Sequence, residues 1–222
     1  EDTSLIDVDS TRGWWYDVVA EDFDKDGDMD LVIGNLGNNY KYQTSGDETF
    51  DIFYNDFDQN NTGDIVLSYY NDGEQYPLRG RQCSSEQIPA IKMKFQDYDA
   101  FSIATLEDVY TEPALENSLH YFSKTFSSVY LENTGNSFNM SKLPPLTQLS
   151  SINKILKKDI DKDGYIDIVV SGNMYNSEVE TPRNDASVGV YLKFTPDFGF
   201  EAVPTQKSGL FINGDVKDME FI

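Results

Sequence analysis

Three nine-residue segments of this chain repeat one arrangement of oxygen-bearing side chains. They cover residues 22–30, 56–64 and 159–167, and we call them loops one, two and three. In each loop the side chains at positions 1, 3, 5 and 9 are Asp or Asn. Alternating oxygen ligands on a tight turn suit a hard cation, because calcium takes six to eight oxygens at about 2.3–2.6 Å. We therefore expect up to three Ca²⁺ sites.

The predicted ligands are the side chains at positions 1, 3, 5 and 9 and the main-chain carbonyl at position 7. They are Asp22, Asp24, Asp26, Asp28, Asp30, Asp56, Asp58, Asn60, Thr62, Asp64, Asp159, Asp161, Asp163, Tyr165 and Asp167. Gly27 and Gly164 occupy position 6, where glycine permits a sharp turn. Loop two has Asn61 there, and Asn tolerates left-handed backbone better than most residues.

Other interpretations of the loops are an EF-hand, a magnesium site and plain Asp-rich turns. An EF-hand needs a bidentate Glu at position 12, but that position holds Ile33, Leu67 and Val170. Magnesium prefers a tighter octahedron with several waters. Asp and Gly favour turns without any metal. However, carboxylates about 4 Å apart repel by roughly 4 kcal/mol at an effective dielectric of 20, so a turn with four of them favours a bound cation.

Short apolar runs flank each loop and predict β-strands. Residues 18–19, 52–53 and 155–156 precede the loops, and residues 31–33, 65–67 and 168–170 follow them. Such runs, bounded by turn residues, are typical of strands. A hairpin is expected at residues 129–140 with its tip at 133–136, and further strands at residues 188–194 and 200–203.

The region between loops two and three has a different pattern. Residues 84–124 show apolar residues near helical spacing, which predicts an insertion of two or three helices. One helix is expected to begin near Ser84 and another at Pro113, and His120 falls on an expected apolar helix. The C-terminal residues 214–222 resemble the strand that leads into each loop, which predicts that the array continues with another Asp-rich loop.

The composition excludes several classes of partner. The net charge is −22, from 39 acids against 17 bases, and such a chain repels nucleic acid and anionic membranes. No run of 18 apolar residues exists, so no membrane insertion is expected. Cys83 is disfavoured as a nucleophile because His120 is the only possible histidine partner.

The three loops and their flanking strands resemble the FG-GAP/VCBS repeat family. Its signature is an apolar strand, D-x-D-x-D-G-x-x-D and then D-[IL]-[IV], and the resemblance covers residues 15–34, 49–68 and 152–171. It implies a mainly β fold, a β-propeller or a partial propeller of about three to four blades, with calcium between the first two strands of a blade. Residues 1–222 would form one propeller-like region that contains the 84–124 insertion. Loop two departs from the pattern because it lacks glycine at position 6.

Three functions are compatible with these features. The first is a non-catalytic, calcium-binding module of a secreted or surface protein that mediates adhesion by binding a protein or a glycan. Residues 84–124 and 171–187 would give specificity, and exposed aromatic residues could stack on sugars; these are Trp14, Tyr40, Tyr42, Tyr69, Tyr70 and Tyr175.

The second function is a calcium-dependent carbohydrate-active enzyme that resembles polysaccharide lyases. It would need a base and positive charge near an acidic sugar, for which His120, Arg79, Arg81, Lys92 and Lys94 are available. The third is a purely structural scaffold. Extracellular calcium modules bind at about 10⁻⁴–10⁻³ M, so an extracellular, periplasmic or cell-surface setting is expected.

Overall fold

The chain is mainly β, with three four-stranded antiparallel sheets and a few short helices. The computed structural model describes residues 10–177 and 181–222. The chain divides into two compact units, whereas the sequence predicted one region. Unit 1 comprises the residues up to Lys41 together with Phe126–Ile222, and unit 2 is Tyr42–Thr125.

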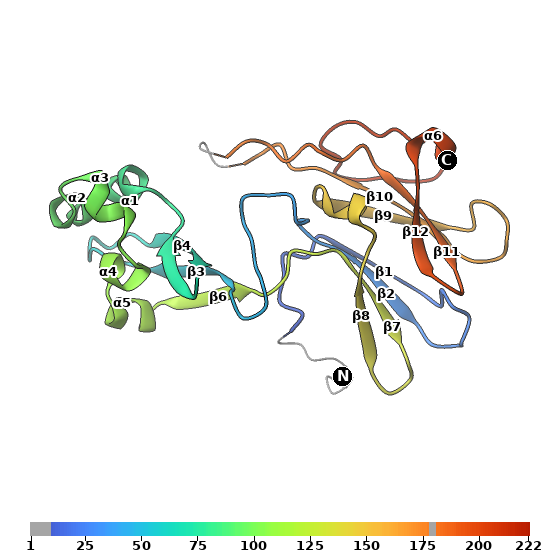
Figure 1. The fold of residues 1–222 in the computed structure, drawn as a ribbon, viewed down its shortest axis with the longest axis horizontal. Coiled ribbons are helices and arrows are strands. Elements are labelled where there is room, and N and C mark those ends of the chain that lie inside the picture. Colours follow the sequence, from blue (N-terminus) through green and yellow to red (C-terminus); the bar gives the residue numbers. More distant parts are fainter. Residues whose placement is uncertain (1–9, 178–180) are drawn as a thin grey trace. The chain divides into compact units, whose positions relative to one another are not determined.

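The first sheet of unit 1 combines segments that lie far apart in the sequence (Figure 1). Its order is β1-β2-β7-β8, with bounds Asp17–Glu21, Asp30–Gly34, Val129–Asn133 and Phe138–Lys142. β7 pairs antiparallel with β2 in a register that places Leu131 opposite Leu31. The hairpin expected at residues 129–140 is confirmed as β7–β8. All of unit 2 therefore lies, in the chain, between the second and third strands of this sheet.

The second sheet of unit 1 is built from consecutive strands. Its order is β12-β11-β10-β9, with bounds Gly199–Val203, Val190–Thr195, Asp167–Gly172 and Ile152–Lys158. The strands expected at residues 188–194 and 200–203 are confirmed as β11 and β12. A 3-10 helix, Pro145–Gln148, precedes this sheet, and α6, Thr205–Ser208, follows it.

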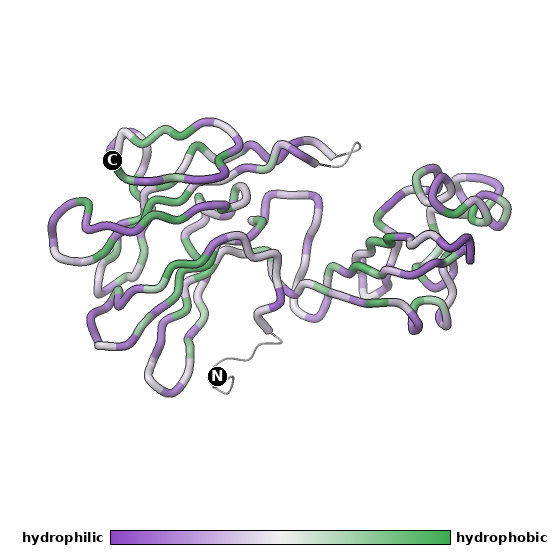
Figure 2. Tube along the Cα trace, turned by 180° about the vertical axis from the view of Figure 1, so that it is seen from behind, coloured by the Kyte–Doolittle hydropathy of each residue, from purple (hydrophilic) through white to green (hydrophobic). Residues whose placement is uncertain are grey.

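The two sheets of unit 1 meet along their first strands, β1 and β9. The N–H of Ile155 donates to Asp17 Oδ2 at 2.8 Å, and Lys157 Nζ donates to the carbonyl of Ala20 at 2.6 Å. A Cβ atom on Gly34 would lie 2.4 Å from the carbonyl oxygen of Ile152, so only glycine permits this approach. Apolar side chains of both sheets form one core. Its fully buried members include Phe23, Val32, Ile168, Val170 and Leu192. Figure 2 shows mainly hydrophobic strands in these sheets and mainly hydrophilic loops between them.

The C-terminal segment contacts β9 but forms no strand within residues 209–222, contrary to the expectation for residues 214–222. The N–H of Val216 donates to the carbonyl of Gly172 at 2.9 Å. In the repeat alignment this bond corresponds to the 3.0 Å bond from Ile152 N to the carbonyl of Asn35. The segment therefore contacts the second sheet through the same repeat positions that the second sheet uses to contact the first.

Unit 2 has a sheet of different strand order, β5-β4-β3-β6. The strands are Glu74–Pro77, Asp64–Asn71, Phe50–Asn55 and Leu119–Ser123. Five helices, α1 to α5, lie between β5 and β6, with bounds Arg81–Gln87, Ala90–Lys94, Tyr98–Ser102, Leu106–Tyr110 and Glu112–Glu116. β3 is therefore paired on both sides, unlike β1 and β9, which pair on one side only.

A helical insertion is confirmed, but it extends from residue 81 to residue 116 and has five short helices where two or three were expected. Residues 119–123, which the spacing of Leu119 and Phe122 placed in a helix, form the strand β6 and pair with β3. His120 is consequently on a strand: its Nε2 lies 2.6 Å from the buried Asp51 Oδ1, and its ring stacks on Phe53 with centroids 4.2 Å apart. Residues three apart point to opposite faces of a strand, so this spacing alone favours a helix. Pairing with the edge of β3, whose backbone groups would otherwise be unpaired, favours the strand.

The helices of unit 2 cover one face of its sheet. Phe53 and Val66 of the sheet pack against Ile91, Phe101 and Leu106 of the helices. Unit 2 thus has a hydrophobic core of its own, separate from that of unit 1.

Candidate metal sites

The backbone takes the same course in all three Asp loops. Position 6 has a positive φ in each loop: 101° at Gly27, 67° at Asn61 and 96° at Gly164. The expected tolerance of Asn61 for this conformation is confirmed. Position 4 also has a positive φ, between 60° and 66°, although no glycine is present there; the residues are Lys25, Gln59 and Lys162. Lys and Gln are not typical of a positive φ, so the residue types at position 4 do not predict this second turn position.

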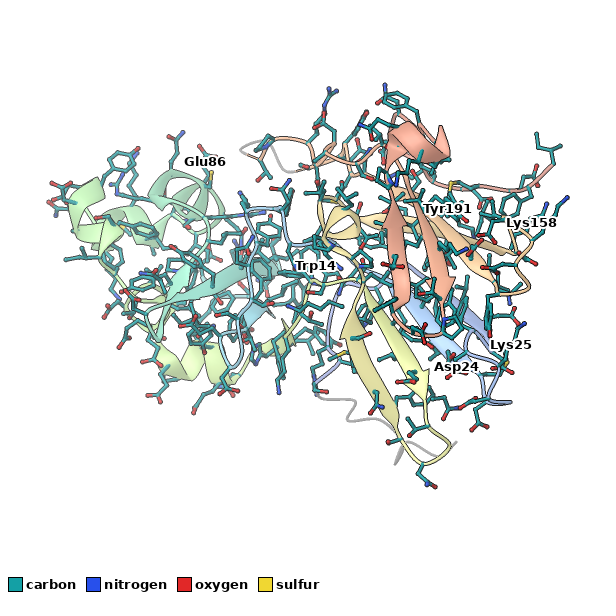
Figure 3. All side chains as sticks on the ribbon, turned by 45° about the vertical axis from the view of Figure 1, so that its right-hand side comes forward. Trp14, Asp24, Lys25, Glu86, Lys158 and Tyr191 are labelled. Atoms are coloured by element: carbon teal, nitrogen blue, oxygen red, sulfur yellow. The ribbon has the colours of Figure 1, made fainter. Side chains whose placement is uncertain are left out.

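Loop one joins β1 to β2 and brings three carboxylates together. Asp22, Asp24 and Asp26 each offer an oxygen, and these oxygens all lie within 4.8 Å of one another. Figure 3 labels Asp24 and Lys25 on this loop. The N–H of Gly27 donates to Asp22 Oδ2 at 3.1 Å, which leaves Asp22 Oδ1 buried without a hydrogen-bond partner. A buried carboxylate oxygen without a donor is costly, and a bound cation would remove that cost.

Loop three, between β9 and β10, repeats this geometry. Oxygens of Asp159, Asp161 and Asp163 lie within 4.8 Å of one another. The N–H of Gly164 donates to Asp159 Oδ2 at 3.1 Å, and Asp159 Oδ1 is again buried without a partner. Two loops in two different sheets therefore leave the same oxygen of the same repeat position without a donor.

The Asp at position 9 has a second role in loops one and three. Asp30 and Asp167 are fully buried, and each accepts three hydrogen bonds, which come from the N–H of loop position 2 and from two groups on the third strand of the sheet. For Asp30 these donors are Phe23 N at 3.2 Å, Tyr130 OH at 2.8 Å and Asn133 N at 2.8 Å.

The donors to Asp167 are equivalent. They are Ile160 N at 3.1 Å, Tyr191 OH at 2.9 Å and Phe194 N at 3.1 Å. Neither Asp30 nor Asp167 belongs to the three-Asp clusters, so their metal-ligand role stays a prediction. Burial, followed by the bond to the carboxylate, raises the pKa of the Tyr130 and Tyr191 hydroxyls.

Loop two, in unit 2, differs from the other loops. Its cluster contains the position-9 residue: Asp56, Asp58 and Asp64. Both oxygens of Asp56 accept hydrogen bonds, from Asn60 N at 2.9 Å and Asn61 N at 2.8 Å. The first Asp of loop two therefore lacks the buried oxygen without a donor that Asp22 and Asp159 have.

The short strand β5 explains the different position of Asp64. β5 pairs with β4 only from Ser68 to Asn71, so the third strand ends before it reaches the loop. Asp64 is nearly fully buried and accepts the N–H of Phe57 at 3.0 Å, without a tyrosine donor from a third strand. Burial, together with the nearby Asp58 and Asp56, raises the pKa of the Asp64 carboxyl, although the N–H of Phe57 opposes this shift.

The electrostatic surroundings distinguish loop one from loop three. In loop one, burial raises the pKa of the Asp24 carboxyl, and the charges of Asp30, Asp26 and Asp22 raise it further, against the N–H of Asp26. In loop three, Lys193 of β11 forms ion pairs with Asp161 and, at 2.8 Å, with Asp163. The bond from Lys193 lowers the pKa of the Asp163 carboxyl.

The residue of β7 that corresponds to Lys193 is Glu132. The hydroxyls of Tyr130 and Tyr191 bind the position-9 Asp in the same way, and Glu132 and Lys193 each follow two residues later. The sequence contained this difference, but only the strand pairing places the two residues in equivalent positions. Loop one thus has an acidic residue where loop three has a basic one.

The position-7 residues contribute to the turn through their N–H groups. Asp28 N donates to Asp26 Oδ1 at 2.8 Å, Thr62 N to Asn60 Oδ1 at 2.7 Å, and Tyr165 N to Asp163 Oδ1 at 2.9 Å. The carbonyls of Asp28, Thr62 and Tyr165 stay predicted ligands.

The aromatic residues proposed for sugar stacking have different surroundings. Tyr42 is buried and stacks on Phe50 with centroids 4.6 Å apart, so it packs inside unit 2. Trp14 is half-buried against Phe126, and Tyr175 lies against the guanidinium of Arg183. Tyr69 keeps 37% of its surface exposed.

Comparisons with known proteins found no relatives. No protein-family model, no curated protein and no solved structure matches this chain. Within the described residues, none of the helices has the length and apolar character needed to span a membrane.

Proposed function

We propose that this protein is a calcium-binding β-propeller module of the FG-GAP/VCBS type. The observation that carries the proposal is the duplicated geometry of loops one and three, where Asp22 Oδ1 and Asp159 Oδ1 are buried without a donor beside two further carboxylates. Hydrogen-bonded Asp turns alone would not require such an oxygen. The family resemblance of the three loops points to the same cation.

The side chains available in loop one fit calcium. Asp22, Asp24 and Asp26 supply hard carboxylate oxygens, and calcium prefers such ligands together with main-chain carbonyls. The ion would supply two positive charges to a cluster whose members repel one another. Loop three fits in the same way once Lys193 moves aside. Loop two fits less well, because both oxygens of Asp56 already accept N–H groups.

A propeller architecture is supported by the two sheets of unit 1. Each has four antiparallel strands in an order that leaves the first strand at one edge, and these first strands meet. Lys154 of β9 lies 3.7 Å from Asp17 of β1 and 3.6 Å from Asp218 of the C-terminal segment, which are equivalent positions of the repeat. Repetition of one contact is what an array of blades around an axis would produce.

The biological role proposed with this architecture is binding of a protein or a glycan by a secreted or surface module, without catalysis. The five helices and β6 of unit 2 are the main departure from a plain repeat, and they would give the module its specificity.

Calcium titration of the chelator-treated chain by calorimetry tests the proposal. Two sites with dissociation constants of about 10⁻⁴–10⁻³ M are expected, as in extracellular calcium modules. Asp22→Asn and Asp159→Asn should each remove one site, whereas Asp197→Asn, in the β11–β12 turn, should remove none. The absence of calcium-specific heat, or equal binding by the double variant, would contradict the proposal.

A further inference from the structure

Unit 2 contains an aromatic pocket that has no part in the calcium loops. It has a volume of about 290 Å³ and lies among β4, β5, the start of α1, and α3. Its walls include Tyr69, Tyr76, Tyr98 and Phe101. Tyr69 and Tyr76 lie opposite each other on the paired strands β4 and β5, and their tilted rings have centroids 6.3 Å apart. The volume is close to the lower end of the range for small-molecule sites, which is enough for one sugar-sized ring.

The charge of the pocket differs from that of its surroundings. Within Tyr42–Thr125, 15 acids outnumber 5 bases. The residues that line the pocket nevertheless include Arg79 and Arg81 and no Asp or Glu. The pocket is therefore a basic site in an acidic unit.

Arg81 carries a buried charge without a carboxylate partner. The residue is 8% exposed, and its guanidinium donates to the carbonyls of Phe95 at 2.6 Å and Gln96 at 3.1 Å. Its Nη2 also donates to the carbonyl of Lys92 at 3.5 Å. Among residues 10–177 and 181–222 the guanidinium forms no ion pair, and its Nη1 donates no hydrogen bond but is not buried from solvent. A guanidinium pairs best with a planar carboxylate, so this accessible donor in the pocket wall suits an anionic ligand.

The remaining walls indicate its shape. Tyr98 is 61% exposed and lies over the Arg81 guanidinium, with 5.2 Å from Cζ to the ring centroid. Tyrosine offers a flat apolar face and a hydroxyl together, which suits a ring that has both C–H and O–H groups. A sugar ring with a carboxylate meets the requirements for charge, shape and hydrogen bonding at once.

We propose that this pocket binds a uronic acid unit of an acidic glycan. Its carboxylate pairs with Arg81, and its ring stacks on Tyr98 against the Tyr69–Tyr76 pair. The inference rests on the glycan-binding branch of the proposed function and gives it a site and a ligand class.

The test is a calorimetric titration of the 222-residue chain with trigalacturonate and, separately, with the neutral galactose trisaccharide. Calcium is omitted, since it would complex the uronate. Trigalacturonate should bind at least tenfold more tightly than the neutral sugar, as expected for a hydrogen bond between charged groups. Equal affinity for the two sugars, or no binding of trigalacturonate, would overturn the assignment. A sulfated galactose oligosaccharide is the third ligand, and binding as tight as that of the uronate would overturn the carboxylate assignment.

Two variants locate the site. Tyr98→Ala should weaken uronate binding about three- to tenfold, because one stacking face is lost. Tyr121→Ala is the matched control: Tyr121 is 60% exposed in the same unit, lies on β6 and does not line the pocket. Equal effects of the two changes would contradict the proposal. Arg81→Gln should abolish the preference for the acidic sugar, and its folding is checked by circular dichroism.

A calcium titration of the same preparation separates the two hypotheses. Intact calcium binding without uronate binding overturns only the pocket assignment. Uronate binding without calcium binding overturns the calcium proposal and leaves the pocket in place.

Discussion

The Asp loops of unit 1 and unit 2 share a backbone but differ in how the surrounding sheet holds them. In unit 1 a third strand extends to the loop, and its tyrosine and N–H groups bind the position-9 Asp. In unit 2 the third strand, β5, ends at Pro77 opposite Ser68, and Asp64 joins the other carboxylates instead. The same nine-residue pattern therefore produces one kind of carboxylate cluster where the third strand reaches the loop and another where the third strand ends short of it.

This difference separates two roles that the sequence pattern combines. In unit 1, positions 1, 3 and 5 form the cluster, and position 9 connects the loop to the third strand. In unit 2 the position-9 residue, Asp64, both belongs to the carboxylate cluster and accepts the N–H of loop position 2.

The largest effect is expected from loss of the buried position-9 carboxylate in unit 1. Asp30→Ala and Asp167→Ala each leave three donors unsatisfied, so the free energy of unfolding should fall by about 3–5 kcal/mol. Asp64→Ala, which removes the acceptor of the Phe57 N–H and of the Gln87 side chain, should cost less, about 1–2 kcal/mol. Denaturant unfolding, monitored by hydrogen exchange of the amides of each unit, measures the loss in free energy of unfolding for each variant. Equal losses of stability in the unit 1 and unit 2 variants would show that the third strand does not stabilise the loops of unit 1.

A smaller effect is expected from the helix cap of α4 in unit 2. Thr105 Oγ1 accepts the N–H of Asp108 at 3.2 Å, and Asp108 Oδ2 accepts the N–H of Thr105 at 2.9 Å. Thr105→Ala should lower the stability of unit 2 by about 1 kcal/mol. Since each unit has its own core, amides of unit 2 should exchange faster and those of β1, β2 and β7 should not change. Faster exchange in both units would contradict this separation.

The same cap predicts a pH dependence. Bonds from Thr105 lower the pKa of the Asp108 carboxyl below its usual range. A lowered folded-state pKa stabilises the fold above the ordinary carboxyl pKa, and this contribution is lost as the pH falls through the lowered value. The cost of Thr105→Ala should therefore shrink in acid. A cost that is constant from neutral pH to about pH 2 would exclude the charged cap.

The smallest predicted effect distinguishes the two sheets of unit 1. Lys193 neutralises part of the loop-three cluster, so it competes with calcium there. Lys193→Met should tighten calcium binding at loop three about two- to fivefold, in line with the modest strength of exposed ion pairs. Glu132→Gln, at the equivalent position of β7, should weaken calcium binding at loop one or leave it unchanged. Weaker binding after Lys193→Met would contradict the competition.

Features determined by local sequence could be predicted. Gly27, Asn61 and Gly164 adopt the expected turn, and the apolar runs beside the loops are strands because their period and composition favour strands. The hairpin β7–β8 followed from the Asn and Gly residues at its tip.

Features determined by distant partners could not be predicted. Pairing of β2 with β7 depends on residues about 100 positions away, so the insertion of all of unit 2 into one sheet left no local signal. For the same reason the sequence did not predict that Tyr130 and Asn133 donate hydrogen bonds to Asp30. Strand β6 was mistaken for a helix because the three-residue spacing of Leu119 and Phe122 is typical of a helix, whereas its pairing with β3 left no local signal.

Thermal unfolding with 10 mM calcium against excess chelator tests the central claim most directly. Binding to the native state should add about 1.4–2.7 kcal/mol per site at a ten- to hundredfold excess over the dissociation constant. The unfolding midpoint should rise with calcium in the natural chain, and the Asp22→Asn/Asp159→Asn double variant should lose most of that rise. An unchanged midpoint in the natural chain, or an undiminished rise in the double variant, would contradict calcium binding by loops one and three.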